Sequence, residues 1–447
     1  MTYGRLVCDI KENKTETHRT RLTVGGNLLD FAGLLSTFTA TVTTAKCLFN
    51  SVISTPGAKC LITDIKNFYL NNDIPDPEYM KFHIHIIPQE RIDEYALHKI
   101  VGGNGWVYLE IVKGMYGSEQ AGIIANMELT KHLDNFGYHP VQHTPGLWKH
   151  NTREKIFTLV VDDFAIKYAS KQDADHLLQA LCAKYIISTD WDAFLHIGIT
   201  LNWNYVAGND DLSMPKYAAR ALHKFKQALQ KFHPNNKPEY SPHKHVEPKY
   251  GKKVRYEEPT DDAPTLASVD INLIQKIAGT FLYYGIAVDN TILVALGTIA
   301  SEQSYATSNT AKKITELLNY LATNPDETIC YKHSDMVLWV HSDTSYLYCP
   351  KARIRAGGMH FLSDKPPSPN NQTNFEPTLN VIVYVVCKIL RNIMASAAES
   401  ELGALFLHCQ EAVPIRVTLE EMGHPQPPTP VQVDNSTSLV IATGKIK

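Results

Sequence analysis

Two adjacent aspartates, Asp162 and Asp163, are the strongest candidates for chemistry in this sequence. In KIFTLVVDDFAIKY they separate two apolar stretches, Phe157–Val161 and Phe164–Tyr168, which predicts a β-hairpin with both acids at its tip. Tight hairpin turns ordinarily prefer Asn-Gly or Asp-Gly, because those residues accept positive φ angles. Adjacent like charges repel unless a cation neutralises them, and carboxylate oxygens are hard ligands that suit Mg²⁺. We interpret the pair as metal ligands, with two solvated turn residues as the structural alternative.

Two more segments of the first half carry candidate residues. Asp64 follows the short apolar run Cys60–Ile62 in KCLITDIKNFYL, which predicts a buried strand that presents a carboxylate at a sheet edge. Between Asp64 and the paired acids, a glycine-rich turn around Gln120 (KGMYGSEQAG) leads into a predicted helix. Aspartates also end ordinary strands, and glycines also flank ordinary helix caps, so neither segment decides a function by itself.

A second acidic group is predicted near the end of the chain. Asp343 ends an apolar strand in VLWVHSDTSYL, after which RAGGMHFLS supplies a Gly-Gly turn into another strand. Glu399 lies one turn before an apolar stripe of a helix, so we expect it to face whatever this stripe packs on. Asp434 ends a further strand, and Asn435 begins a helix. Acids from two strand ends and one helix can converge on a metal pair; each is also a plausible cap or surface residue. The stripe consists of Leu402, Leu405, Phe406 and Cys409.

The three segments of the first half, in this order, resemble the palm of copia-type LTR-retrotransposon reverse transcriptases. TDIKNFYL is similar to the first metal-binding motif, KGMYGSEQAG to the template- and nucleotide-contacting motif, and LVVDDF to the paired-acid motif. Upstream, RTRLTVGG (19–26) resembles the fingers segment that grips the incoming triphosphate. Downstream, LHIGITLNWNY and the helix from Met214 resemble the segments that close the palm and support the primer. The resemblance covers nearly the whole chain.

This resemblance implies an RNA-directed DNA polymerase, a nucleotidyltransferase. Asp64 and Asp162 would bridge two Mg²⁺ ions, with Mn²⁺ as an alternative ion, roughly 3.5–4 Å apart. Asp163 would complete the acidic cluster. The implied partners are an RNA template, a DNA primer, an RNA–DNA hybrid and deoxynucleoside triphosphates.

The resemblance also implies nucleotide- and template-binding roles for three residues. Arg21 would neutralise the β and γ phosphates, where a guanidinium donates in bidentate fashion. Tyr69 falls where the family places a bulky side chain under the sugar, a position that favours deoxynucleotides; a core aromatic is the alternative. Gln120 would contact the nucleotide or the template.

The second acidic group resembles the ribonuclease H domain that follows reverse transcriptase in these polyproteins. The resemblance implies that Asp343, Glu399 and Asp434 hold two Mg²⁺ ions against the RNA strand of a hybrid. The family has a fourth acid beyond the position of Lys447, so we expect weaker metal binding and little ribonuclease activity from three ligands. The sequence also departs from the family at Ser118-Glu119, where Leu-Pro or Leu-Lys is usual.

These patterns predict an α+β chain: a right-hand polymerase with fingers, palm and a helical thumb or connection, followed by a ribonuclease H-like mixed sheet. We expect fingers and palm in residues 1–212, the thumb, a basic linker and connection helices in 213–330, and the ribonuclease H-like domain, C-terminally incomplete, in 331–447. As a piece of a transposable-element polyprotein, it would lack capsid, protease and integrase parts and act in the cytoplasm, in a virus-like particle, or in the nucleus.

Bulk properties agree with a globular protein. Hydrophobic residues make up 44% and charged residues 20% of the 447 residues. The net charge is −3, but residues 213–255 hold eleven Lys or Arg against two Glu, a local excess that suits a phosphate backbone or a solvated helix and linker. We expect no membrane span, because the longest apolar run is 381–387. The eight cysteines form no C-x-x-C pair, which predicts neither a disulfide framework nor a zinc site.

Three functions remain open at this stage. The first is a polymerase with an attached hybrid-cleaving domain. The second is a catalytically inactive, nucleic-acid-binding relic, which Glu119 and the missing family segments favour. The third is a metal-dependent nuclease that acts through Asp343, Glu399 and Asp434 alone.

Overall fold

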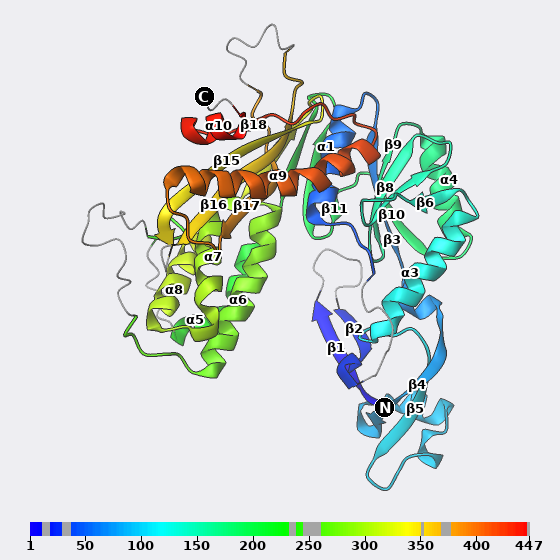
Figure 1. Cartoon of the computed structure of the whole chain (residues 1–447). Helices are drawn as coiled ribbons and strands as arrows, with labels where there is room; N and C mark the ends of the chain where they lie inside the picture. The colour runs from blue at the N-terminus through cyan, green and yellow to red at the C-terminus, as the bar shows by residue number, and fades with distance from the viewer. Residues whose placement is uncertain are drawn as a thin grey trace. The chain divides into compact units, whose positions relative to one another are not determined.

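The computed structural model describes residues 1–10, 18–28, 37–231, 238–244, 261–349, 353–367 and 377–444. It confirms a chain of mixed helices and sheets, divided into two compact units (Figure 1). Unit 1 comprises 1–40, 61–141 and 145–191, and unit 2 comprises 41–60, 142–144 and 192–447. Much of the predicted basic linker, at 232–237 and 245–260, lies outside the described residues.

In its described residues, unit 1 contains two sheets, one of six strands and one of four, together with three α-helices. The six-stranded sheet has the order β10-β3-β9-β8-β7-β6 and the four-stranded sheet has the order β2-β1-β4-β5. The elements are β1 Thr2–Ile10, β2 His18–Val24, β3 Lys59–Ile65, β4 Asp73–His83, α2 Gln89–Glu94, β5 Trp106–Lys113, α3 Glu119–Asp134, β6 Tyr138–Pro140, β7 Leu147–His150, β8 Lys155–Val160, β9 Asp163–Tyr168, α4 Lys171–Cys182 and β10 Ile187–Asp190.

The six-stranded sheet is held by a continuous apolar core. Helix α3 contributes Ala125, Leu129 and Leu133, which recur every four residues and therefore share one helix face. Helix α4 adds its own buried face, and the strands add large rings such as Phe157 and Phe164, whose centroids lie 5.4 Å apart. Each fully buried side chain of this size stabilises the fold by about 1.5–3 kcal/mol relative to exposure. This core fixes β3 and β9 side by side.

Unit 2 contains two four-stranded sheets, ordered β11-β12-β13-β14 and β17-β16-β15-β18, and seven α-helices. Its elements are α1 Val42–Ser54, β11 Leu195–His196, β12 Ile199–Asn204, β13 Asn209–Ser213, α5 Tyr217–Lys231, α6 Ser268–Ala287, α7 Leu293–Glu302, α8 Ser308–Thr323, β14 Thr328–Lys332, β15 Val337–Cys349, β16 Arg353–Ser363, β17 Ile382–Ile389, α9 Ala397–Glu421, β18 Val431–Gln432 and α10 Ser436–Ala442.

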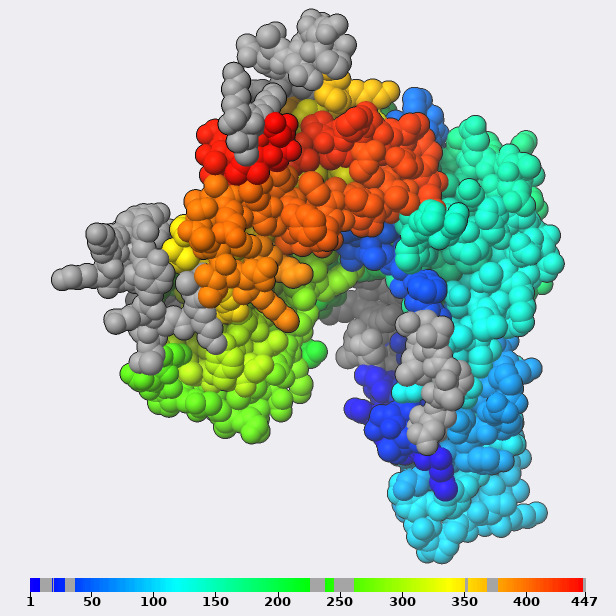
Figure 2. Space-filling model, viewed as in Figure 1, coloured from blue at the N-terminus to red at the C-terminus, as the bar shows by residue number. Residues whose placement is uncertain are grey.

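Helix α9 packs on strands β15 and β16 of the second sheet. Its buried face includes Glu401, Ala404, His408, Ala412 and Ile415, at spacings of three or four residues. The outer face of the same helix lies open at the surface (Figure 2), where Phe406 is 65% and Val413 is 59% exposed. The predicted core stripe was therefore wrong, because the helix has two apolar faces and the sheet binds the other one.

Helix α9 also continues well beyond the predicted stripe, to Glu421. Pro414 lies inside it. Proline removes one backbone hydrogen bond and ordinarily breaks a helix, which is why the sequence suggests an earlier end. Burial of Ile415 and Leu419 beyond the proline offsets this loss. Helices α5, α6 and α8 lie where the periodicity predicts them.

In the part of the chain that the structure describes, no helix is both long enough and apolar enough to cross a membrane.

Asp210, on β13, is fully buried, and neither of its carboxylate oxygens makes a hydrogen bond of normal geometry. The pKa of this carboxyl is raised from 3.8 to about 7, mainly by burial and in small part by the charge of Asp211, while the backbone N–H of Asn202 opposes the shift. The folded state therefore keeps a proton that the unfolded state loses near pH 4, so this group destabilises the fold as pH rises from about 4 to 7.

We expect the Asp210→Asn variant to unfold at a higher urea concentration than the wild type at pH 8. Its free energy of unfolding should be higher by at most about 4 kcal/mol. The difference should shrink toward pH 4, because the carboxyl of the unfolded state becomes protonated as the pH approaches its pKa of 3.8. Urea titrations across this pH range measure it. A difference that does not vary with pH would contradict the assignment.

Gly357 and Gly358 lie within β16, so the predicted Gly-Gly turn is wrong. A Cβ on Gly358 would lie 2.1 Å from the His408 ring and 2.5 Å from the His341 carbonyl oxygen, whereas the nearest atom to a Cβ on Gly357 would be 4.0 Å away. The close approach of α9 to the sheet thus requires glycine at 358. We expect Gly358→Ala to lower the free energy of unfolding by about 1–3 kcal/mol. Gly357→Ala, the matched control in the same urea titration, should not destabilise the protein.

Candidate metal centre

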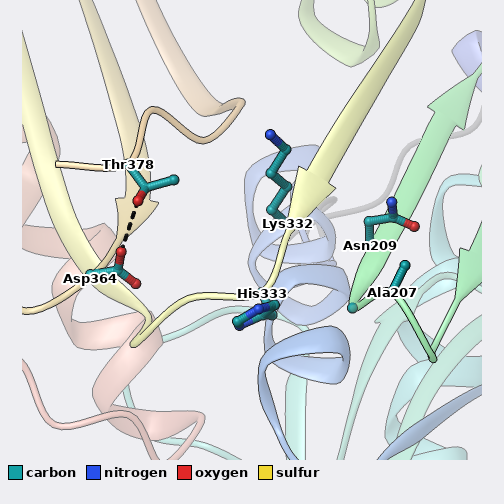
Figure 3. Close-up of a pocket in the computed structure, with 7 residues that line it drawn as sticks. Ala207, Asn209, Lys332, His333, Asp364 and Thr378 are labelled. Carbon is teal, nitrogen blue, oxygen red and sulfur yellow. Dashed lines mark hydrogen bonds between the residues drawn. The ribbon is translucent and has the colours of Figure 1, made fainter.

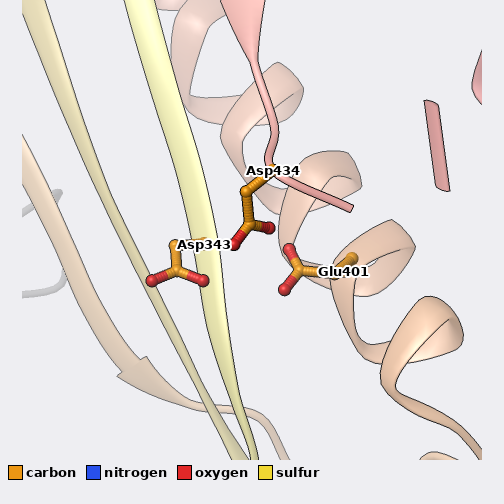
Figure 4. Close-up of side chains that lie close together, drawn as sticks. All are labelled: Asp343, Glu401 and Asp434. Carbon is orange, nitrogen blue, oxygen red and sulfur yellow. The ribbon is translucent and has the colours of Figure 1, made fainter. Parts of the chain in front are cut away.

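Three carboxylates of unit 2 come together on the sheet that α9 covers (Figure 4). Asp343, Glu401 and Asp434 each offer one oxygen, and these oxygens lie within 4.8 Å of one another. Among the described residues this is the group of three acids, histidines or cysteines gathered closely enough to hold a metal ion. Oxygen ligands of this kind suit Mg²⁺ and related hard cations.

The register of two parallel strands places the two aspartates. Strand β18 pairs with β15 through Val340↔Val431 and His341↔Gln432. Asp343 and Asp434 lie two residues beyond the second pair on their respective chains, so the same register carries them side by side. Asp343 is also opposite Gly357, which has no side chain to fill the space beside it. Contrary to the prediction, Asp343 does not end its strand, because β15 continues to Cys349.

The position of Glu401 depends on how α9 docks. His408 Nε2 lies 3.0 Å from the Gly357 carbonyl oxygen, and His408 is fully buried. Glu401 precedes His408 by seven residues, two helical turns, and therefore shares its face. Ser438 of α10 donates to the Ala398 carbonyl at 3.0 Å, which ties the segment after Asp434 to the start of α9.

The electrostatics of this group favour a bound cation. Glu401 is only 6% exposed, and its Oε2 has no hydrogen-bond partner. The pKa of Glu401 is raised from 4.5 to about 7, mainly by burial and in addition by the charges of Asp343 and Asp434. A divalent cation would relieve both the desolvation and the mutual repulsion.

Glu399, which the sequence suggests as the helix ligand, does not belong to this group. Its carboxylate accepts a hydrogen bond from the Ala395 backbone N–H at 2.6 Å, and its own N–H donates to Ser396 Oγ at 3.1 Å. Glu399 therefore caps α9 and is exposed, while Glu401 faces the sheet. Glu399 and Glu401 are two positions apart in the helix, which is about 200° around its axis. Their side chains therefore cannot both face the same metal. The motif Ser396-x-x-Glu399 is a capping signal in the sequence that identifies this role.

The predicted acids of unit 1 lie on neighbouring strands. Asp64 is on β3 and Asp163 begins β9, and β3 and β9 are adjacent in the sheet. The Ile65 backbone N–H donates to the Asp162 carbonyl at 3.1 Å, which brings the end of β3 beside the hairpin turn. Within the described residues, these three acids do not form a group of ligand atoms as close as the one in unit 2.

The hairpin turn itself differs from the predicted one. Its two turn residues are Val161 and Asp162, and Asp163 pairs with Val160 as the first residue of β9. Val161 has φ = +62°, a left-handed conformation that is rare for a β-branched residue. Such strain costs on the order of 1–3 kcal/mol and persists only where the surrounding structure imposes it. The hydrophobic core against which Val161 packs imposes it here.

Two of the predicted nucleotide-binding residues, Arg21 and Tyr69, both contact the ring of Tyr116. The Arg21 guanidinium lies 4.9 Å from the centre of the Tyr116 ring, and that ring is 5.2 Å from the Tyr69 ring in an edge-to-face arrangement. Burial raises the pKa of the Tyr69 hydroxyl, and the charge of Asp162 raises it further. The sequence analysis missed Tyr116, although an aromatic residue inside a glycine-rich turn could have identified it. Gln120, in the first turn of α3, is buried at 7% exposure.

A surface cavity of about 280 Å³ lies elsewhere in unit 2 (Figure 3). Thr378 donates to the Asp364 carboxylate there at 3.0 Å. None of the predicted site residues lines this cavity, which is bounded by Ala207, Gly208, Asn209, Lys332, His333, Asp364 and Thr378.

No protein-family model matches this sequence. Among solved structures, the chain is similar to the foamy viral protease-reverse transcriptase in complex with an RNA/DNA hybrid, at 11% sequence identity and a TM-score of 0.43. The match covers 98% of this chain and 46% of that chain, so this chain spans less than half of that protein's length.

We expect Glu401→Gln to weaken Mn²⁺ binding by roughly tenfold or more, about 1.4 kcal/mol, because it removes one of three anionic ligands. Glu399→Gln is the matched control two residues away on the same helix, and should bind Mn²⁺ as the wild type does. Isothermal titration with Mn²⁺ alone compares the three proteins. Equal losses in both variants would contradict the assignment of Glu401.

Proposed function

We propose that this chain is a nucleic-acid enzyme of the reverse transcriptase type, an RNA-directed DNA polymerase of a copia-type LTR retrotransposon with an attached ribonuclease H-like centre. Its partners would be an RNA template, a DNA primer, their hybrid and deoxynucleoside triphosphates. The observation that carries metal-dependent phosphodiester chemistry is the approach of Asp343, Glu401 and Asp434 within 4.8 Å. The motif order of the first half supports the polymerase part.

At the hydrolytic centre, Asp343, Glu401 and Asp434 would hold Mg²⁺. Bound ions would polarise the scissile phosphate and supply a hydroxide at neutral pH. The role of the chain is to hold the ligands rigidly: the parallel register of β15 and β18 sets the aspartates, and the buried His408 sets the helix that carries Glu401. Glu401 takes the role that the sequence suggests for Glu399.

At the polymerase centre, Asp64, Asp162 and Asp163 would hold the ions that serve nucleotidyl transfer. The adjacency of β3 and β9 and the hydrogen bond from Ile65 to Asp162 support this assignment. Arg21, held over the Tyr116 ring, would meet the triphosphate, because a guanidinium binds phosphate oxygens in bidentate fashion.

For the same centre, we propose that the Tyr69 ring lies under the sugar and that Gln120 contacts the base or template. Under this proposal, residues 1–212 form the fingers and palm and residues 331–447 form the ribonuclease H-like domain.

A second candidate is a hybrid nuclease without polymerase activity. The specific observation that favours it is that the acids of unit 2, and not those of unit 1, are gathered to metal-binding distance. An inactive nucleic-acid-binding relic is the third outcome of the same experiment.

We expect Asp162→Asn to abolish primer extension on poly(rA)/oligo(dT) while hybrid cleavage continues, and Asp343→Asn to have the opposite effect. The two centres use separate ligand sets, so the losses should be independent. Extension and cleavage of a labelled RNA–DNA hybrid, each with Mg²⁺ and with Mn²⁺, measure both.

Hybrid cleavage without extension in the wild type would select the nuclease. If the wild type shows neither activity but binds the duplex in a salt-dependent way, the chain is an inactive binding protein and the proposed enzyme is wrong.

A further inference from the structure

The four-stranded sheet of unit 1, β2-β1-β4-β5, has one face in a hydrophobic core and one open face. The buried face carries Val24, Met80 and Ile111, each at most 5% exposed. Because side chains alternate along a strand, the residues between these point to the opposite face. That opposite face is rich in aromatic rings.

A row of three residues crosses the open face from strand to strand. Tyr3 of β1 pairs with Lys81 of β4, and Lys81 pairs with Tyr108 of β5. Paired residues share a face, so the row places a cation between two rings. Tyr3 is 39% and Tyr108 is 51% exposed. The Tyr3 ring lies so close to Gly25, the residue after β2, that a Cβ there would be 2.5 Å from it.

The neighbouring pairs continue the same chemistry. His83 pairs with Trp106, and their rings meet edge to face at 5.1 Å. The Lys81 ammonium lies 5.3 Å from the centre of the Trp106 ring. On the other side of the row, Tyr79 is 51% exposed and donates its hydroxyl to Glu110 at 3.2 Å.

Positive charge is placed where a backbone phosphate would need it. Lys81 is exposed at the centre of the row, and Arg5, the next residue of β1 on this face, is exposed as well. Glu110, an acid on this face, accepts the Tyr79 hydroxyl. Neighbouring strands lie about 4.8 Å apart, so the backbones of the two tyrosines are roughly 10 Å apart, with the lysine on the strand between them.

We propose that this face binds single-stranded nucleic acid: bases stack on Tyr3, Tyr108 and Trp106, and Lys81 and Arg5 contact the phosphates. Exposed rings on an open sheet, interleaved with cations, recognise unpaired bases because every base has a π-face, whereas a paired duplex hides its bases from such rings. This binding surface goes beyond the two metal centres and does not depend on their activity.

The test uses the full chain and a fluorescein-labelled oligothymidylate of about 20 nucleotides, longer than the roughly 4–16 nucleotides that one such surface covers. Fluorescence anisotropy without divalent cations gives the Kd. We expect Tyr3→Ala and Tyr108→Ala each to weaken binding roughly tenfold. Tyr108→Phe should bind as the wild type does, because stacking needs the ring and not the hydroxyl. Lys81→Gln should lower the slope of log Kd against log salt by about one.

Tyr95→Ala is the matched control, since Tyr95 is a 65% exposed tyrosine of the same unit at the end of α2. It should leave the Kd unchanged. Asp162→Asn and Asp343→Asn should also leave it unchanged, which separates failure of the metal chemistry from failure of this surface.

The inference is overturned if the alanine variants bind as the wild type does, or if Tyr108→Phe loses as much affinity as Tyr108→Ala. It is equally overturned if Tyr108→Ala changes the sedimentation of the protein but not its affinity for the oligonucleotide. That result would assign the face to a protein partner.

Discussion

The repulsion between three carboxylates is the constraint on which the C-terminal part of unit 2 depends. Asp343, Glu401 and Asp434 approach within 4.8 Å, and the fold must hold them there against their charge. It does so with two rigid devices. One is the parallel pairing of β15 with β18, and the other is the contact of His408 with the Gly357 carbonyl, which Gly358 permits. One device is a backbone pairing and the other joins a buried side chain to a backbone carbonyl, so the acids cannot separate without loss of these contacts.

The acids of unit 1 are positioned in a different way. Their spacing is set by the adjacency of β3 and β9 and by one backbone hydrogen bond at Asp162. Val161 adopts a positive φ angle and forms the turn together with Asp162, so that Asp163 is the first residue of β9. Strain at this point is maintained by the core beneath it, where Val161 packs among large aromatic side chains. The two acidic groups are therefore positioned in two ways. In unit 2 the carboxylates themselves converge, and in unit 1 the order of the strands brings the acids near one another.

Helix α9 shows where sequence reasoning fails and why. It has apolar residues on two faces, and periodicity alone does not tell which face a sheet will cover. In the more apolar stripe, Phe406 and Cys409 are exposed and the two leucines are half-buried, while the buried face holds His408 and Glu401. Glu399 lies on the face of the predicted stripe, whereas Glu401 lies on the face that the sheet covers. The capping motif at Ser396 and Glu399 was the local signal that could have corrected it, because a carboxylate engaged by the helix start is not free to face the sheet.

The sequence by itself determined the types of the elements, the hairpin that carries Asp162 and Asp163, and the helix start at Asn435, because these depend on neighbours within a few residues. It also identified Asp64, Asp343 and Asp434 as candidate metal ligands. Only the tertiary structure decided which acid of α9 joins them and that Asp343 lies within a strand. It also decided which face of the sheet β2-β1-β4-β5 remains open. These outcomes depend on register and docking between segments far apart in the chain, and such contacts leave no trace in local periodicity.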